Sequence, residues 1–248
     1  PLRIAAFYLS KMQQYEAAQS PFSSYTIPDK EWQKQIMHFG GGTTTSEQAD
    51  FSYCLSVYEA LLEGVKFGGN VQTFLKQSSD PIDPIEYAEV MQQIQDGVSI
   101  MTFFGHSTIN GFDQNIDEPS NWNNTGKYPF LIGNACYSGD IFQPGIISAS
   151  EEFVFEHQKG TIAFLSTSKL GFVPNLHSFS TVFFTRVANV DYGLSVGYIL
   201  RQTIGQIQPS TVGANLLQEN VCTQMTLHGD PALKINYHQA PELVVRQQ

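Results

Sequence analysis

Val98-Ser99-Ile100-Met101-Thr102-Phe103-Phe104 is the first of three apolar runs that decide the fold of this 248-residue chain. The other two cover residues 130–135 (FLIGNA) and residues 161–166 (TIAFLS). All three are short and continuous, whereas a strand with one face in water would alternate between apolar and polar residues. Continuous runs of this length are typical of parallel strands that helices cover on both faces. The three runs therefore predict the centre of a largely parallel sheet.

Segments with the apolar spacing of helices lie around these runs. The alternation of strand and helix predicts the α/β class, as a three-layer sandwich with a mostly parallel sheet and helices on both faces. The expected helices cover residues 46–63, 86–95, 148–157, 177–189 and 194–207, and further short strands cover residues 34–39 and 71–75.

The composition excludes several classes of protein. Hydrophobic residues make up 42% of the chain and charged residues only 15%, which allows a sizeable core and argues against intrinsic disorder. The 23 acidic side chains outnumber the 13 basic ones, so we expect no basic surface for nucleic acid. No apolar run reaches the roughly 18 residues of a membrane span. Three widely spaced cysteines, none in a CxxC pair, exclude a disulfide scaffold and a zinc ribbon.

The residues that follow the strands are where a site is expected, because ligands of open α/β sheets bind beyond the carboxyl ends of the strands. His106 follows the first run and Cys136 the second. On neighbouring strands they would project from one sheet edge, as the general acid/base and the nucleophile of a cysteine peptidase. An imidazole beside a thiol makes that thiol nucleophilic at neutral pH. The backbone N–H groups of Ser107 and Cys136 are the expected donors to an oxyanion.

Each of these residues also has a purely structural interpretation. A free cysteine at the end of an apolar strand is commonly a small apolar filler, and a histidine there is commonly a hydrogen-bonded polar group. Their pairing, each with a glycine in its turn, favours chemistry. Cys54 lies on the apolar stripe of its helix and Cys222 in a segment of mixed composition, so we expect both in the core.

Three segments resemble the gingipain-like family of cysteine peptidases. Residues 104–107 (FGHS) are similar to the family's catalytic histidine segment, residues 134–140 (NACYSGD) to its cysteine segment, and residues 227–233 (LHGDPAL) to its closing strand. The resemblance extends over about residues 36–235. It implies a caspase-like fold, hydrolysis of peptide bonds in protein or peptide substrates by Cys136 and His106 without a cofactor, and export to the bacterial surface or medium, in many members by the type IX secretion machinery.

The resemblance also implies how the chain is organised. Residues 1–240 would form a gingipain-like catalytic α/β domain, truncated at its N-terminus, because residues 2–6 (LRIAA) resemble a strand end that family members reach after a longer upstream segment. Residues 241–248 would be a linker or tail. Contacts with secretion machinery would then be made by regions outside this chain.

Two departures from the family pattern concern the site. Ser107 stands where the family commonly has glycine, which alters the oxyanion loop. The stretch that matches the strand of the family's supporting acid, residues 38–42 (HFGGG), holds no carboxylate, and the nearest are Glu47 and Asp50. Either Glu47 or Asp50 reaches His106 from the following loop, or the enzyme works as a bare dyad. Asp50 is alternatively a loose counterpart of the acidic group in the family's specificity pocket.

Ser168 and Lys169 follow the third run and would border the S1 pocket of a caspase-like fold. A cation at Lys169 would repel a basic P1 side chain, so we expect P1 to be acidic or small rather than Arg or Lys. A lysine that only points into solvent would leave P1 unconstrained.

Weaker motifs have simpler structural interpretations. Residues 40–45 (GGGTTT) precede a helix and could cradle a phosphate, but they lack the P-loop lysine and the GxGxxG order, which favours a plain turn. Asp113, Asp117 and Glu118 could hold a structural calcium ion. Their spacing is not that of an EF-hand, which favours solvated loop acids, and no other metal ligands are expected.

Three other functions fit the sequence. A catalytically degenerate peptidase fold could serve recognition, secretion or surface attachment, which the missing carboxylate and Ser107 would favour. In a sortase-like transpeptidase, an amine rather than water would accept the acyl group. The third alternative is a flavodoxin-like nucleotide binder.

Overall fold

A six-stranded sheet forms the centre of the computed structural model, which describes residues 2–19, 27–80, 87–114, 116, 118–211, 213 and 215–235. The strand order is β2-β1-β3-β4-β5-β6, in which the first five strands are parallel and β6 is antiparallel to β5. The α/β class and the mostly parallel sheet are therefore as predicted. The strands are β1 (Gln35–Gly40), β2 (Asn70–Leu75), β3 (Ile100–Phe104), β4 (Phe130–Asn134), β5 (Ala163–Thr167) and β6 (Met225–His228).

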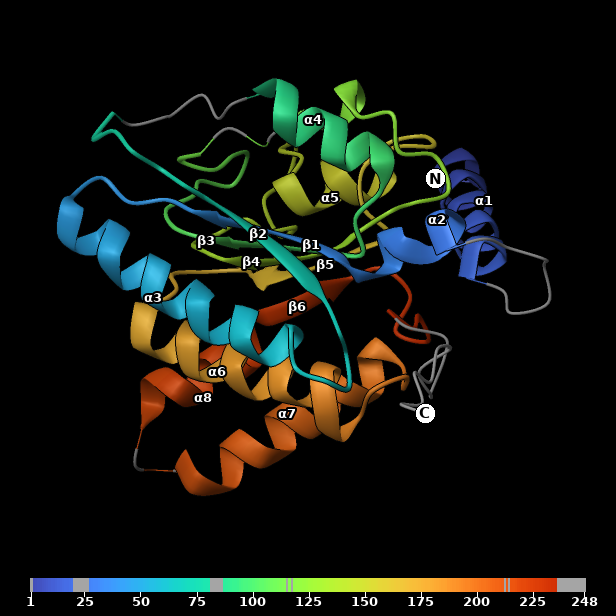
Figure 1. The fold of residues 1–248 in the computed structure, drawn as a ribbon. Coiled ribbons are helices and arrows are strands. Elements are labelled where there is room, and N and C mark those ends of the chain that lie inside the picture. The colour runs from blue at the N-terminus through green and yellow to red at the C-terminus, as the bar shows by residue number, and fades with distance from the viewer. Residues whose placement is uncertain are drawn as a thin grey trace.

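Helices cover both faces of the sheet, which makes three layers (Figure 1). Helices α3, α6, α7 and α8 lie on one face, and α4 and α5 on the other. The helices are α1 (Leu2–Gln19), α2 (Ile27–Lys30), α3 (Thr45–Leu62), α4 (Tyr87–Asp96), α5 (Ala149–Phe155), α6 (Val173–Thr185), α7 (Val196–Thr211) and α8 (Leu216–Gln224), with short helical turns η1 (Glu31–Lys34), η2 (Pro119–Asn121) and η3 (Arg186–Val190).

The continuous apolar runs result from burial on both faces. All five positions of β3, β4 and β5 are buried. Along β3, Ile100 and Phe104 pack in the cluster beneath α3 and α6, while Met101 and Phe103 pack in the cluster beneath α4 and α5. Because successive side chains point to opposite faces, a strand between two helical layers needs apolar residues at every position.

The first segment corrects one expectation: residues 2–6 belong to helix α1 and not to the end of a strand. Residues 2–19 contain no glycine or proline and are rich in the helix formers Ala, Leu, Gln and Met. The buried ammonium of Lys11 fastens this helix by donating to the carbonyls of Val154, Lys159 and Thr161 at 2.9, 2.6 and 2.9 Å. Burial lowers the pKa of Lys11 to about 7, although Glu156 opposes the shift.

The segment around Cys222, for which no helix was predicted, forms helix α8. Asn215 caps this helix by accepting a hydrogen bond from the N–H of Gln218 at 3.1 Å. Residues 241–248, expected to be a linker or tail, lie outside the described residues. Within the described part of the chain, no helix is both long enough and apolar enough to span a membrane.

Candidate active site

The predicted histidine and cysteine follow neighbouring strands at the same edge of the sheet. Strands β3 and β4 pair in parallel, with Phe104 opposite Asn134 as the last register pair. His106 and Cys136 each lie two residues beyond that pair. The hydroxyl of Ser107, the residue that departs from the family pattern, donates to the carbonyl of Cys136 and joins the two strand-end loops. Parallel pairing therefore brings the two loops of the predicted dyad together.

Glu47 is the carboxylate that faces His106. Its Oε1 lies 3.3 Å from Nε2 of His106, and the two side chains are 36% and 47% exposed, so the pair is open to a substrate. The other carboxylate oxygen, Oε2, accepts hydrogen bonds from the N–H and hydroxyl of Thr43, both at 2.9 Å, and from the N–H of Thr44 at 3.1 Å. Thr44 in turn caps α3 by accepting from the N–H of Glu47, which completes a capping box. The start of α3 thus fixes the acid that orients the histidine.

The same contacts keep Glu47 ionised. Partial burial alone would raise the pKa of Glu47, but the hydrogen bonds from Thr43 and the contact with His106 outweigh burial and lower it to about 2. Glu47 can therefore hold the ring of His106 in place and stabilise the imidazolium that proton transfer would create.

A buried carboxylate, Asp113, ties the loop before α3 to the histidine loop. Its Oδ2 accepts from the N–H of Gly42 at 2.8 Å, and its Oδ1 accepts from the N–H of His106 at 3.2 Å. The ammonium of Lys76, 0% exposed, lies 3.6 Å from Oδ2 and compensates its charge. A Cβ atom on Gly41 would lie 2.0 Å from Oδ1, so this close approach requires glycine. Asp113 thus connects the loop that leads into α3, where Glu47 lies, with the loop that carries His106.

The thiol of Cys136 is partly exposed at this edge. The N–H of Gly171, in the loop after β5, donates to Sγ at 3.4 Å, and Sγ lies 3.7 Å from the carbonyl oxygen of the same residue. The following residue, Tyr137, has a left-handed backbone with φ of 59°, which is uncommon outside glycine and turns the chain sharply after the cysteine.

The geometry around Ser107 leaves its N–H available to an oxyanion. Ser107 and Phe112 form an isolated antiparallel bridge. The hydrogen bonds of this bridge run from the N–H of Asp113 to His106, at 2.9 Å, and from the N–H of Thr108 to Gly111, at 2.8 Å. Ser107 is therefore at a non-hydrogen-bonded position, where the N–H points away from the partner strand.

The other two cysteines are buried and free. Burial and the nearby Asp50 raise the pKa of Cys54 to about 11. Burial and the nearby Glu219 raise the pKa of Cys222. Both thiols are protonated and shielded at neutral pH, as expected of core residues.

The remaining predicted site residues are placed differently. Asp50 is exposed on α3, and no contact between its carboxylate and His106 occurs in the structure as described, so Glu47 alone of the two occupies the supporting position. Ser168 is buried and its N–H donates to the carbonyl of Gln224 at 3.0 Å. The ammonium of Lys169 lies 3.1 Å from Oδ2 of Asp140, which is 1% exposed. Because Lys169 has a fixed counter-ion, its charge gives little reason to expect an acidic P1 residue.

In the glycine-rich turn and among the candidate calcium ligands, the groups that would bind a ligand make contacts within the protein instead. The N–H of Gly42, which a phosphate would need, is taken by Asp113. Asp113 is likewise committed to Lys76, Glu118 accepts a hydrogen bond from the side chain of Asn121, and Asp117 lies outside the described residues. Over the residues with assigned positions, no group of three or more His, Cys, Asp or Glu side chains is arranged to hold a metal ion.

Two features of the site were missed from the sequence. The capping-box pattern Thr44-x-x-Glu47 is visible in the sequence and would have favoured Glu47 over Asp50, because it fixes one carboxylate at the start of the helix. The pair formed by Asp113 and Lys76 has no comparable signal, because its partners lie far apart in the chain and meet only through strand pairing.

A family model connects this chain to known proteins. The model described as Peptidase family C25 matches residues 4–236. Among curated proteins, the sequence has no significant match.

Solved structures share the fold at low sequence identity. The Arg-specific cysteine proteinase gingipain R (RgpB) superposes with a TM-score of 0.67 at 12% identity, over 91% of this chain and 52% of that chain. A structure titled only as a protease gives 0.68 at 17% identity, over 93% and 53%. Separase of Saccharomyces cerevisiae, in complex with securin, gives 0.52 at 14%, over 90% and 13%. These likenesses show the caspase-like α/β fold, and this chain spans about half the length of the first two proteins.

Proposed function

Because the chain belongs to peptidase family C25, we propose that it is a cysteine endopeptidase with Cys136 as nucleophile, His106 as general acid/base and Glu47 as the residue that orients His106. The observation that carries this proposal is the 3.3 Å contact between Nε2 of His106 and Oε1 of Glu47, at the sheet edge where β4 delivers Cys136.

Acylation begins with the thiolate of Cys136. Its sulfur attacks the carbonyl carbon of the scissile peptide bond, and the carbonyl electron pair moves onto oxygen. The N–H groups of Ser107 and Cys136 donate to the developing oxyanion. When the intermediate collapses, the C–N bond breaks, the leaving amine takes a proton from the His106 imidazolium, and a thioester remains on Cys136.

Deacylation uses the same groups in reverse. His106 accepts a proton from a water molecule that attacks the thioester carbon, and the acid product leaves as the C–S bond breaks. With Nε2 directed at Glu47, Nδ1 is the ring nitrogen that exchanges protons with the sulfur, the leaving amine and water. Glu47 stays ionised throughout and stabilises the imidazolium in both steps.

The decisive experiment compares the three cysteines. Cys136→Ala is expected to abolish hydrolysis of a peptide library and labelling by a thiol-directed peptide inhibitor. Cys54→Ala and Cys222→Ala are the matched controls, and both should keep hydrolysis and labelling because those thiols are buried and have raised pKa values. Equal labelling of all three thiols, or turnover by Cys136→Ala, would contradict the proposal.

The same assay separates the alternative functions. Incorporation of an added glycine-peptide amine into the product would identify a transpeptidase. A folded wild-type protein that neither cleaves the library nor reacts at Cys136 would be a degenerate module. An increase in thermal stability on adding a nucleotide would instead favour nucleotide binding.

We also propose that the protein acts at the cell surface or in the medium after export through a secretion machinery. The support is the resemblance to exported gingipain-like peptidases. Fractionation of the organism that makes the protein, with immunoblotting of medium, surface and cytoplasm, tests this. Retention in the cytoplasm would contradict it.

A further inference from the structure

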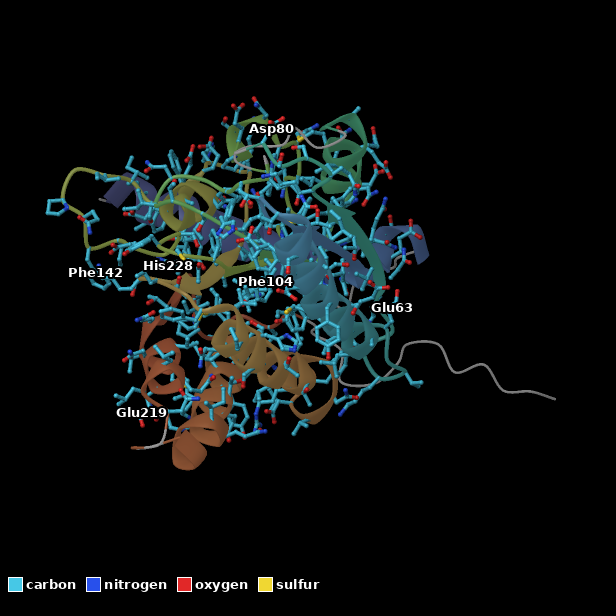
Figure 2. All side chains as sticks on the ribbon, turned by 90° about the vertical axis from the view of Figure 1, so that its left-hand side faces the viewer. Glu63, Asp80, Phe104, Phe142, Glu219 and His228 are labelled. Atoms are coloured by element: carbon cyan, nitrogen blue, oxygen red, sulfur yellow. The ribbon has the colours of Figure 1, made fainter. Side chains whose placement is uncertain are left out.

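A pocket of about 280 Å³ opens beside Cys136 and has no role in the reaction steps above. Its walls come from the residue after the cysteine, the loop after β5 and helix α8. In Figure 2, Glu219 of α8 and Phe142 of the loop after Cys136 both lie toward the left. Ligand pockets commonly measure about 300–1,000 Å³. With a volume just below that range, the pocket suits one or two peptide side chains rather than a cofactor.

Short backbone contacts join the pocket to the thiol. Tyr137, in the pocket wall, donates its N–H to the carbonyl of Lys169 at 3.0 Å, and the N–H of Gly171 lies 3.4 Å from Sγ of Cys136. A carbonyl carbon positioned for attack lies about 3–3.5 Å from the nucleophile. A peptide held for cleavage must therefore pass beside Gly171, within reach of the pocket.

Apolar side chains line this pocket while still exposed to water. Leu170 is 54% exposed, Phe172 47% and Leu217 44%. Large apolar side chains gathered at a concave surface are characteristic of a site that a ligand covers. An apolar side chain seated here would remove this surface from water, which is the favourable hydrophobic term.

The charge in the pocket wall is compensated. Lys169 is the charged residue among the lining residues, and its ammonium lies 3.1 Å from the buried carboxylate of Asp140. Asp140 also accepts from the N–H of Phe142 at 3.2 Å and from the side chain of Gln143 at 3.1 Å, so it is fixed in place. The lining contains no Asp or Glu side chain that could receive a basic residue.

We propose that this pocket selects a neutral, apolar side chain of the peptide substrate within three residues of the scissile bond. This inference rests on the proposed peptidase function and adds the substrate class. It also replaces the expectation of an acidic or small residue, since the cation at Lys169 is already paired.

The test is a positional-scanning peptide library that varies P3 to P1′ one position at a time. At one of these positions, Leu, Phe or Val is expected to be cleaved at least about tenfold faster than Asp, Lys or Arg, in line with what apolar pockets discriminate. A flat profile, or a preference for Lys or Arg at every position that shows selectivity, would overturn the inference.

A single substitution ties the preference to the pocket. Asn220 is an exposed residue in the α8 wall, and Asn220→Asp adds a carboxylate without changing size. The apolar preference should weaken at that position and cleavage after or next to Lys or Arg should rise severalfold. Asn123→Asp makes the same charge change on an exposed residue outside the pocket and should leave the profile unchanged. Identical profiles for the two variants would overturn the assignment to this pocket.

The outcomes also separate this inference from the proposed function. Cleavage that depends on Cys136 but shows no apolar preference overturns the inference and leaves the peptidase function intact. Absence of cleavage and of Cys136 labelling across the library contradicts both.

Discussion

Nε2 of His106 lies 3.3 Å from Oε1 of Glu47, although Glu47 lies in the first turn of α3 and His106 in the loop after β3. The capping box of α3 holds the carboxylate, and Asp113 binds the N–H of His106. The capping box thus fixes the position of Glu47, and Asp113 fixes the position of His106. Each of these two contacts can be removed separately by substitution.

Glu47→Gln is expected to lower kcat/KM by about 10- to 1,000-fold, a share of the 10²–10⁴-fold that general acid/base catalysis contributes. Glutamine can keep the contacts with Thr43 and Thr44 but cannot balance the imidazolium. Steady-state hydrolysis measures the effect, with Asp50→Asn on the same helix as the control. An equal decrease of kcat/KM in both variants, or no decrease in Glu47→Gln, would contradict an orienting role of Glu47.

The charge of Glu47 also predicts a pH dependence of stability. Its pKa is about 2 in the folded state against 4.5 for an unperturbed glutamate, so its contribution to stability is complete above pH 4.5 and is lost as pH falls from 4.5 to 2. The difference in Tm between wild type and Glu47→Gln should shrink over that window. A difference that stays constant from pH 7 to pH 2 would show that the hydrogen bonds from Thr43 and the contact with His106 do not stabilise the carboxylate.

Asp113→Ala should reduce the free energy of unfolding by about 3–5 kcal/mol, because it leaves the buried ammonium of Lys76 without its counter-ion. It should also lower kcat, since His106 and Gly42 lose the acceptor that positions their loops. Urea unfolding and hydrolysis measure the two effects. Asp80→Ala, at the exposed site labelled in Figure 2, is the control and should change the free energy of unfolding by less than about 0.5 kcal/mol.

Gly41→Ala tests the close packing beneath the site without removing a charged group. The added methyl would lie 2.0 Å from Oδ1 of Asp113, so the loop before α3 must move, which we expect to destabilise the fold by about 1–3 kcal/mol and to reduce activity. Gly205→Ala is the matched control. It lies in α7 with open space around its Cβ position and should stabilise the protein by about 0.5–1 kcal/mol. Unchanged stability and activity in Gly41→Ala would contradict the close approach.

His38 predicts a second pH dependence. Its ring is fully buried on β1, neither ring nitrogen has a hydrogen-bond partner among the described residues, and burial lowers its pKa to about 3. The unfolded chain binds this proton at pH 6.5 and the folded chain only near pH 3, so stability falls as pH decreases between these values, by up to about 1.4 kcal/mol per pH unit. His38→Leu should flatten that slope in urea titrations, whereas the exposed His157→Leu should not. Equal slopes in the two variants would show that His38 is protonated in the folded state.

The parts of the fold that were predicted correctly depend on local pattern. The three apolar runs are strands because a chain buried on both faces needs apolar residues at every position. Helices α3, α4, α5 and α7 lie where apolar spacing indicated them, with ends shifted by a few residues. Helix α1 was misjudged because its short apolar start was compared with a strand end, while the helix-forming composition of the whole segment was not weighed.

By itself, the sequence determined the α/β class and the positions of His106 and Cys136 just beyond the ends of two apolar strands, because burial and strand periodicity are local properties. That these two strands pair with each other was decided by the tertiary structure. Only the tertiary structure decided that Glu47 rather than Asp50 contacts His106, that Lys76 compensates Asp113, and that Asp140 compensates Lys169. These choices depend on which loops the parallel register brings together and on which direction each side chain leaves its backbone. A distance between charges on separate segments is a property of the assembled sheet and has no local signature in the chain.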